Sequence, residues 1–142
     1  MNNQVVAQQL IHTQAKEPTK FRLNSKQSSP YSSPYIEHWV VQLHGVDHKR
    51  IDDPEALVSN LRQAVSDLSL TRVSDHTHYF GPGVSSVIIL SESHLSAHTW
   101  PELGYVHLDI VTCVKRLTGE NLRAVMQSVF EPGRMQLAQL EY

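Results

Sequence analysis

Alternation along residues 104–113 constrains the fold more than any other feature of the chain. Val106, Leu108 and Ile110 occupy every second position, while Tyr, His, Asp, Val and Cys fill the positions between them. Successive side chains of a β-strand point to opposite faces, so the segment predicts a strand with one apolar and one more polar face. A sheet built from such strands is covered on one face and can leave the other face open.

The remaining chain predicts further strands and two helices. A helix begins within residues 52–55, where a proline follows an acidic cap, and carries apolar residues at steps of three and four. Thr118 can cap a second helix that ends at Pro132 and Gly133. Strands are expected at 38–43, 70–73, 76–79, 84–90, 104–113 and 134–141. The order, roughly β-α-β-β-β-α-β, predicts an α+β fold: a two-layer α/β sandwich with two helices on one face of a mostly antiparallel sheet.

Composition limits the organisation and the classes of function. Residues 1–34, rich in Gln, Asn, Ser and Lys, predict a flexible N-terminal arm, and residues 35–142 predict the folded domain. A formal charge of -2 argues against a nucleic-acid partner. No apolar run is long enough to cross a membrane, and the N-terminus does not have the order of a signal peptide. One cysteine cannot form an internal disulfide, so a cytoplasmic location is expected.

Residues 91–113 concentrate the groups that carry chemistry. They include the hydroxyl of Ser93, the imidazole of His98, several carboxylates and the only thiol, that of Cys113. Such side chains attack carbonyls, move protons and hold charge, and they directly follow the strand-like run 87–90. The sequence therefore predicts an active site here.

The motif Ser-Glu-Ser-His-Leu-x-x-His-Thr-Trp-Pro-Glu, followed by Gly-Tyr and Asp-x-x-Thr-Cys, resembles a known family. It is similar to the self-cleaving, pyruvoyl-dependent S-adenosylmethionine decarboxylase proenzymes of prokaryotic type, densely over 79–113 and loosely over the rest of the domain. The resemblance implies the same two-layer sandwich, decarboxylation of S-adenosylmethionine for spermidine synthesis, and a homodimer of cleaved protomers with active sites at or near the interface.

The resemblance also implies how the chain matures. The Ser93 hydroxyl attacks the carbonyl of Glu92, and the chain is cut between Glu92 and Ser93. Ser93 becomes a covalent pyruvoyl cofactor, whose carbonyl forms a Schiff base with the substrate and draws electrons during loss of carbon dioxide. His98 corresponds to the processing proton donor, and Ser85 corresponds to a second serine needed for processing.

Four residues correspond to positions that act on the substrate. Cys113 aligns with the cysteine that returns a proton to the substrate carbon. Glu102 aligns with a carboxylate that binds the ribose hydroxyls. Tyr79 aligns with an aromatic residue that stacks on adenine, and Phe80 is a second candidate for that position.

Several alternatives stay open at this point. Leu103 and Val114 depart from the family pattern, which leaves a pyruvoyl-dependent arginine or ornithine decarboxylase, or a non-catalytic partner subunit, as other readings. His94 and His98 have the four-residue spacing of a helical zinc site, but the His-Glu-x-x-His pattern is absent and no metal is expected. A serine hydrolase is disfavoured because the chain has no Gly-x-Ser-x-Gly elbow.

Overall fold

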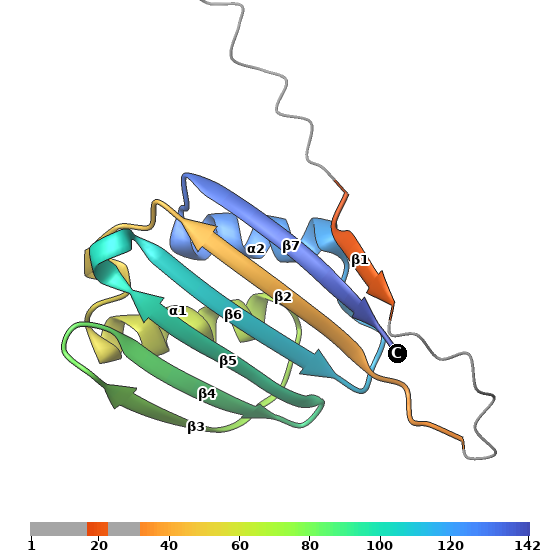
Figure 1. Ribbon diagram of the computed structural model, residues 1–142. Helices are drawn as coiled ribbons and strands as arrows, with labels where there is room; N and C mark the ends of the chain where they lie inside the picture. The colour runs from red at the N-terminus through yellow and green to blue at the C-terminus, as the bar shows by residue number, and fades with distance from the viewer. Residues whose placement is uncertain (1–16, 23–31) are drawn as a thin grey trace, which may run out of the picture.

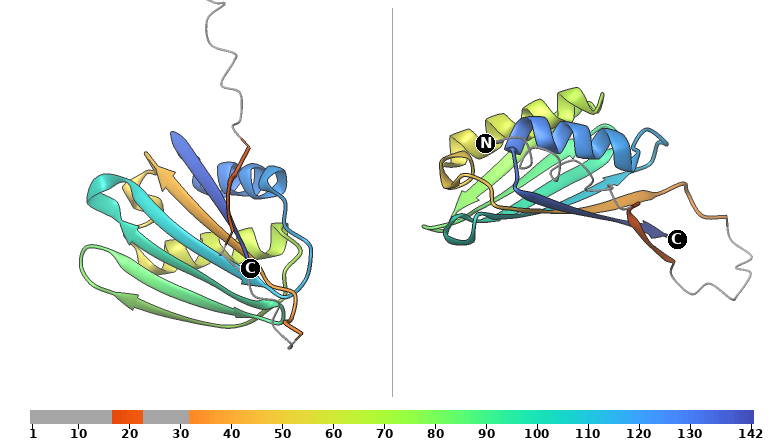
Figure 2. Two further views of the ribbon diagram at one scale, coloured as in Figure 1. Left: turned by 45° about the vertical axis from the view of Figure 1, so that its right-hand side comes forward. Right: turned by 90° about the horizontal axis from the view of Figure 1, so that it is seen from above.

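The computed structural model describes residues 17–22 and 32–142. They form one seven-stranded sheet with two α-helices packed against one of its faces (Figure 1). Seen from above, both helices lie on the same side of the sheet and the opposite face is uncovered (Figure 2). The expected two-layer α+β sandwich is confirmed.

The elements in chain order are β1 (Thr19–Arg22), β2 (Glu37–His44), η1 (His48–Arg50), α1 (Pro54–Asp67), β3 (Arg72–Tyr79), β4 (Val84–Leu90), β5 (Ser93–Trp100), η2 (Pro101–Leu103), β6 (Tyr105–Thr112), α2 (Gly119–Phe130) and β7 (Arg134–Glu141). The strands lie in the order β1-β7-β2-β6-β5-β4-β3. All neighbouring pairs are antiparallel except β1 and β7. Strands β4, β5 and β6 therefore form an antiparallel meander. Residues 91–113 run from the turn after β4 to the residue that follows β6.

The core lies between the sheet and the two helices. The alternation predicted for 104–113 is present in β6, where Val106, Leu108 and Ile110 are fully buried and the residues between them are partly exposed. Leu57 and Leu61 of α1, together with other apolar residues of both helices, cover this side of the sheet. Burial of the apolar face therefore determines which side chains remain on the open face.

Both helices begin where the sequence predicts. The Asp53 carboxylate caps α1 by accepting a hydrogen bond from the Ala56 N–H, directly before Pro54. Thr118 and Asn121 form a reciprocal capping box at the start of α2. These caps satisfy N–H groups that have no partner within the helix.

Two expectations about strands are wrong. Residues 72–73 and 76–79 of the two predicted strands belong to the single strand β3, which has an irregularity in its pairing with β4 between Arg72 and Ser74. Residues 93–100, for which the sequence predicts no strand, form the strand β5, which is paired on both sides with β4 and β6. Pairing on both sides supplies the hydrogen bonds that this weakly apolar segment needs to stay extended.

Most of the predicted arm, residues 1–34, lies outside the described residues. Its described part includes β1, which is an edge strand and pairs in parallel with β7, and Arg22 and Lys20 contact Glu141. Within the described part of the chain, neither helix has the length and hydropathy needed to span a bilayer.

Candidate active site

The Glu92–Ser93 peptide bond lies at the turn between β4 and β5. Ser93 is paired with Leu90 across this hairpin and is exposed. Its φ angle is 150°, in a region that residues with a Cβ atom rarely adopt. Backbone strain of this kind costs of the order of 1–3 kcal/mol and gathers at functional sites. The junction at which the resemblance implies cleavage is therefore a strained one.

The carbonyl oxygen of Glu92 accepts a hydrogen bond from the backbone N–H of Cys113, at an N–O distance of 2.8 Å. Cys113 directly follows β6, which runs beside β5. An N–H group aimed at a carbonyl oxygen stabilises the negative charge that develops there when a nucleophile attacks the carbon. The same contact brings Cys113, whose side chain is exposed, to the end of β5 that carries Ser93.

The side chain of Glu92 holds the β4–β5 turn through buried hydrogen bonds. It is buried, and its carboxylate accepts hydrogen bonds from the Thr71 N–H at 3.0 Å and from Nη1 of Arg116 at 3.1 Å. Burial raises the pKa of this carboxyl, but the hydrogen bonds to the backbone and to Thr71, with the nearby charge of Arg116, outweigh it and hold the pKa below its ordinary value. Glu92 is therefore ionised at neutral pH and fixes the residue that precedes the cleavage point.

Three further side chains are linked to Ser93 on the open face. Oγ of Ser93 lies 3.4 Å from Nδ1 of His94, and Nε2 of His94 lies 3.9 Å from Oδ2 of Asp109. The other oxygen of Asp109 contacts Nε2 of His38 in a short hydrogen bond. Hydroxyl, imidazole and carboxylate thus follow one another beside the junction.

A second cluster lies at the opposite end of the same strands. Ser85 on β4 and His98 on β5 are cross-strand partners, and Oγ of Ser85 lies 2.7 Å from Nδ1 of His98. Gly83 makes the approach to β4 possible, because its φ is +101° and a Cβ atom there would lie 2.9 Å from the carbonyl oxygen of Thr99. The two residues that the resemblance assigns to processing are therefore brought together.

The expected substrate-binding residues lie at this second end. Tyr79 ends β3 and Phe80 follows it, and both rings are exposed, by 52% and 66%. Glu102 is exposed in η2, which directly follows β5. Their exposure leaves them free to contact a ligand or a second molecule.

The two clusters are far apart within one chain. His98 lies five residues beyond Ser93 on β5, and at about 3.3 Å per residue the separation is roughly 16 Å. Figure 1 shows the two ends, with the β4–β5 turn at one and the η2 segment at the other. Ser93 and Cys113 therefore lie together, and Ser85, His98, Tyr79, Phe80 and Glu102 lie together, but a single chain does not join the two sets.

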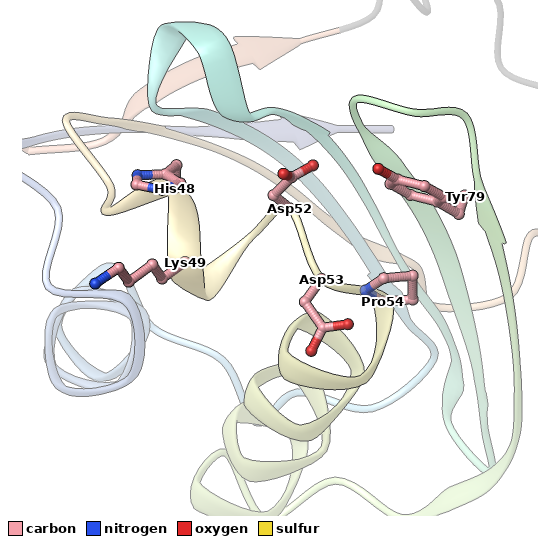
Figure 3. A pocket seen from close by; sticks show the side chains of 6 residues that line it. All are labelled: His48, Lys49, Asp52, Asp53, Pro54 and Tyr79. Atoms are coloured by element: carbon pink, nitrogen blue, oxygen red, sulfur yellow. The ribbon is translucent and has the colours of Figure 1, made fainter.

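Three surface hollows of the described residues lie away from the reactive groups. A hollow of about 520 Å³ is lined by Tyr79 and by residues of η1 and the start of α1, namely His48, Lys49, Asp52, Asp53 and Pro54 (Figure 3). Two others, of about 960 and 600 Å³, lie beside β1 and β7 and beside α2. None of the three is lined by Ser93, His98 or Cys113. Ser93 and Cys113 are both exposed.

The strand conformation of β5 also removes the helical zinc site. Residues four apart lie on one face of a helix, but on a strand His94 and His98 are roughly 13 Å apart. Among the described residues, no three His, Cys, Asp or Glu side chains are placed to bind one metal ion.

Sequence reasoning missed several groups at the Ser93 end. Arg116 and Thr71 hold the Glu92 carboxylate, and Asp109 and His38 extend the contact made by His94. Asp109 shares a strand face with Cys113, which is a signal in the sequence. Nothing in the sequence places Thr71, because its partner is 21 residues away.

Comparisons with known proteins identify the family of the chain. The family model described as S-adenosylmethionine decarboxylase matches residues 37–141. An S-adenosylmethionine decarboxylase proenzyme of Sulfurihydrogenibium sp. is 46% identical over 77 residues, which cover 54% of this chain and 58% of that protein. A proenzyme of the same name from Methanococcus maripaludis is 33% identical over 106 residues, which cover 74% of this chain and 87% of that protein.

The fold comparison gives the same family. The crystal structure of the adenosylmethionine decarboxylase from Aquifex aeolicus superimposes with a TM-score of 0.67 and 31% identity, covering 76% of this chain and 90% of that one. The resemblance noted on residues 91–113 is thus confirmed over most of the folded part. This chain belongs to the S-adenosylmethionine decarboxylase family.

Proposed function

We propose that the chain is a proenzyme that cuts itself between Glu92 and Ser93 and then decarboxylates S-adenosylmethionine, with residues 35–142 as the enzyme domain. The observation that carries this proposal is the strained Glu92–Ser93 junction, whose carbonyl oxygen accepts the Cys113 N–H. The proenzyme name of the relatives agrees with it.

The junction fits conversion of Ser93 into a pyruvoyl group. Oγ of Ser93 attacks the Glu92 carbonyl carbon, the Cys113 N–H stabilises the resulting oxyanion, and the C–N bond breaks to leave an ester. Loss of the Ser93 α-hydrogen then breaks the ester and releases the new C-terminal carboxylate of Glu92. Hydrolysis of the dehydroalanine that remains releases ammonia. The pyruvoyl group supplies an electron-withdrawing carbonyl for loss of carbon dioxide.

The separation of the two clusters supports a site made by two copies of the chain. The Ser85–His98 pair cannot reach the Ser93 of its own chain across roughly 16 Å of strand. Two copies related by a two-fold axis, with their open faces together, place one end of each sheet over the opposite end of the other. Val87 and Ile89 are large apolar residues exposed on this face of β4, which is typical of an interface.

In this arrangement each site takes Ser93 and Cys113 from one copy and His98 with Ser85 from the other. His98 donates the proton that the nitrogen of Ser93 needs when the C–N bond breaks. Glu102, Tyr79 and Phe80 lie at the same end as His98, so they contribute substrate contacts from the second copy.

Intact-mass measurement of the purified protein tests the proposal. We expect fragments 1–92 and 93–142, with the second lighter by one ammonia than a fragment that begins with serine. A carbon dioxide release assay on S-adenosylmethionine, arginine and ornithine then identifies the substrate, and we expect release from S-adenosylmethionine. An uncut chain that is active contradicts self-cleavage, and release from arginine or ornithine alone contradicts the substrate.

Replacement of the thiol separates maturation from catalysis. Cys113→Ala should still be cut, because alanine keeps the backbone N–H that binds the Glu92 carbonyl oxygen. Its kcat should fall by about 100-fold or more, since no group returns a proton to the substrate carbon. Cleavage is measured by intact mass and turnover by carbon dioxide release. Unchanged turnover in the cut variant would remove Cys113 from this role.

Replacement of the exposed carboxylate tests substrate binding. Glu102→Gln should be cut normally, but its KM for S-adenosylmethionine should rise about 10-fold or more, because charged acceptors bind hydroxyl groups more strongly than an amide does. Glu120→Gln, in the first turn of α2, is the matched control and should leave KM unchanged. A KM equal to that of the wild type in Glu102→Gln would exclude the ribose contact.

A further inference from the structure

The roles assigned so far to self-cleavage include no acceptor for the hydroxyl proton of Ser93. His98 supplies a proton to the departing nitrogen, but the hydroxyl of Ser93 must also lose its proton as it attacks. We infer that His94 is the general base that takes this proton, and that Asp109 and His38 are positioning residues for its imidazole. The inference rests on the proposed self-cleavage and assigns a further catalytic residue to it.

The first supporting observation is the contact between neighbours in the chain. Oγ of Ser93 lies 3.4 Å from Nδ1 of His94. Adjacent side chains of a regular strand point to opposite faces, so such contacts are unusual. Here Ser93 begins β5 with a φ of 150°, which departs from strand geometry and lets its hydroxyl meet the imidazole of the next residue. The unusual backbone angle thus brings the nucleophile and the proposed base into contact.

The second observation is the carboxylate behind the imidazole. Nε2 of His94 faces Oδ2 of Asp109 at 3.9 Å, and Oδ1 of Asp109 is hydrogen bonded to Nε2 of His38. A carboxylate beside Nε2 favours the tautomer with the proton on that nitrogen, which leaves the lone pair of Nδ1 directed at Ser93. It also stabilises the imidazolium that forms, as the aspartate does in a Ser-His-Asp triad.

The third observation is that Asp109 is itself held in place. Register pairs Asp109 with Ser96, which puts it diagonally across from His94 on the same face. On its other side His38 of β2 contacts it, and Nδ1 of His38 lies 2.9 Å from the hydroxyl of Tyr142. This chain of contacts crosses three strands and fixes the carboxylate toward His94.

By register, the titratable residues on either side of His94's partner in β6 are Asp109 and Cys113. The cross-strand partners of His94 are Ile89 on β4 and Val111 on β6, and both are apolar. Asp109 is therefore the charged group that faces the imidazole from β6, and His38 faces that carboxylate from β2.

The proton transfers balance. The hydroxyl proton of Ser93 passes to Nδ1 of His94 as Oγ bonds to the Glu92 carbonyl carbon. His98 of the second copy gives a proton to the Ser93 nitrogen as the C–N bond breaks. His94 then returns its proton to water, and His98 takes one from water. No electrons are gained or lost, and one amide becomes one ester.

Cleavage rates of three variants test the inference, with the newly made full-length chain followed by intact mass. His94→Ala should be cut about 100-fold or more slowly, the usual size of a general-base effect. His76→Ala, an exposed histidine on β3, is the matched control and should be cut at the wild-type rate. Asp109→Asn should be cut about 10-fold more slowly, and Asp109→Glu should recover most of the loss.

Two further readouts separate chemistry from structure. Wild-type cleavage should slow at a pH low enough to protonate the general base, because a protonated imidazole cannot accept the hydroxyl proton, and His94→Ala should lose this dependence. Added imidazole should accelerate His94→Ala and leave His76→Ala unchanged.

The outcomes distinguish this inference from the function on which it rests. If the wild-type chain is never cut, self-cleavage itself is wrong. If the wild type is cut and His94→Ala is cut at the same rate, self-cleavage stands and His94 is not the base. A slow His94→Ala that keeps the wild-type pH dependence and does not respond to imidazole also overturns the assignment, because it indicates a structural role.

Discussion

Ser93→Ala is expected to remain one uncut chain of 142 residues and to release no carbon dioxide from S-adenosylmethionine. Alanine has no hydroxyl to attack the Glu92 carbonyl, so neither the ester nor the pyruvoyl group can form. Alanine and serine both carry a Cβ atom, so the strain at φ 150° and the fold are retained. Both losses should therefore be complete, and neither should arise from unfolding.

The measurement is intact mass over several days, together with carbon dioxide release. Ser91→Ala is the matched control, because Ser91 lies in the same turn and its backbone N–H bond to Thr71 does not involve the side chain. This control should be cut and active. An active Ser93→Ala protein would show that the electron sink comes from another group.

Coexpression of Ser93→Ala with His98→Ala is expected to restore a rate of cleavage that neither variant reaches alone. In a mixed pair, the intact Ser93 of the His98→Ala chain meets the intact Ser85–His98 pair of the Ser93→Ala chain. One of the two sites is then complete. Only the His98→Ala chain should be cut, and cleavage should rise from about 100-fold below the wild-type rate to near that rate in mixed pairs.

Different tags on the two chains let intact mass identify which one is cut. The control replaces Ser93→Ala by a double variant, Ser93→Ala with His98→Ala, and should leave every chain uncut. His94→Ala should not be rescued by Ser93→Ala, because His94 acts on the Ser93 of its own chain. Absence of rescue for His98→Ala would mean that each site is built from one chain.

The elements that the sequence predicts well are those whose own side chains determine them. Strand β4 and strand β7 have the predicted limits, and Asp53 and Thr118 cap their helices as expected. In each case a local signal, an apolar run or a capping residue, is sufficient. Burial of one face then accounts for the placement of both helices on the same side of the sheet.

Strand β5 was not predicted because its own apolar signal is weak. Its buried face consists of Leu95, Ala97 and Thr99, two of them small or polar, and its other face is rich in histidine. Hydrogen bonds to both neighbouring strands hold it extended, and these depend on residues before and after it in the chain. Propensity does not contain that contribution.

The sequence by itself determined which chemical groups this protein has, and its motif was sufficient to indicate the family. Ser93, His98 and Cys113 stand within 21 residues of one another, and that closeness along the chain suggested one cluster. Only the tertiary structure decided which of them meet. A strand advances about 3.3 Å per residue, so it separates Ser93 from His98, while sheet pairing brings Cys113 to the Glu92 carbonyl and Asp109 to His94. Strand direction and register, which depend on the whole sheet, therefore decide which groups can react together.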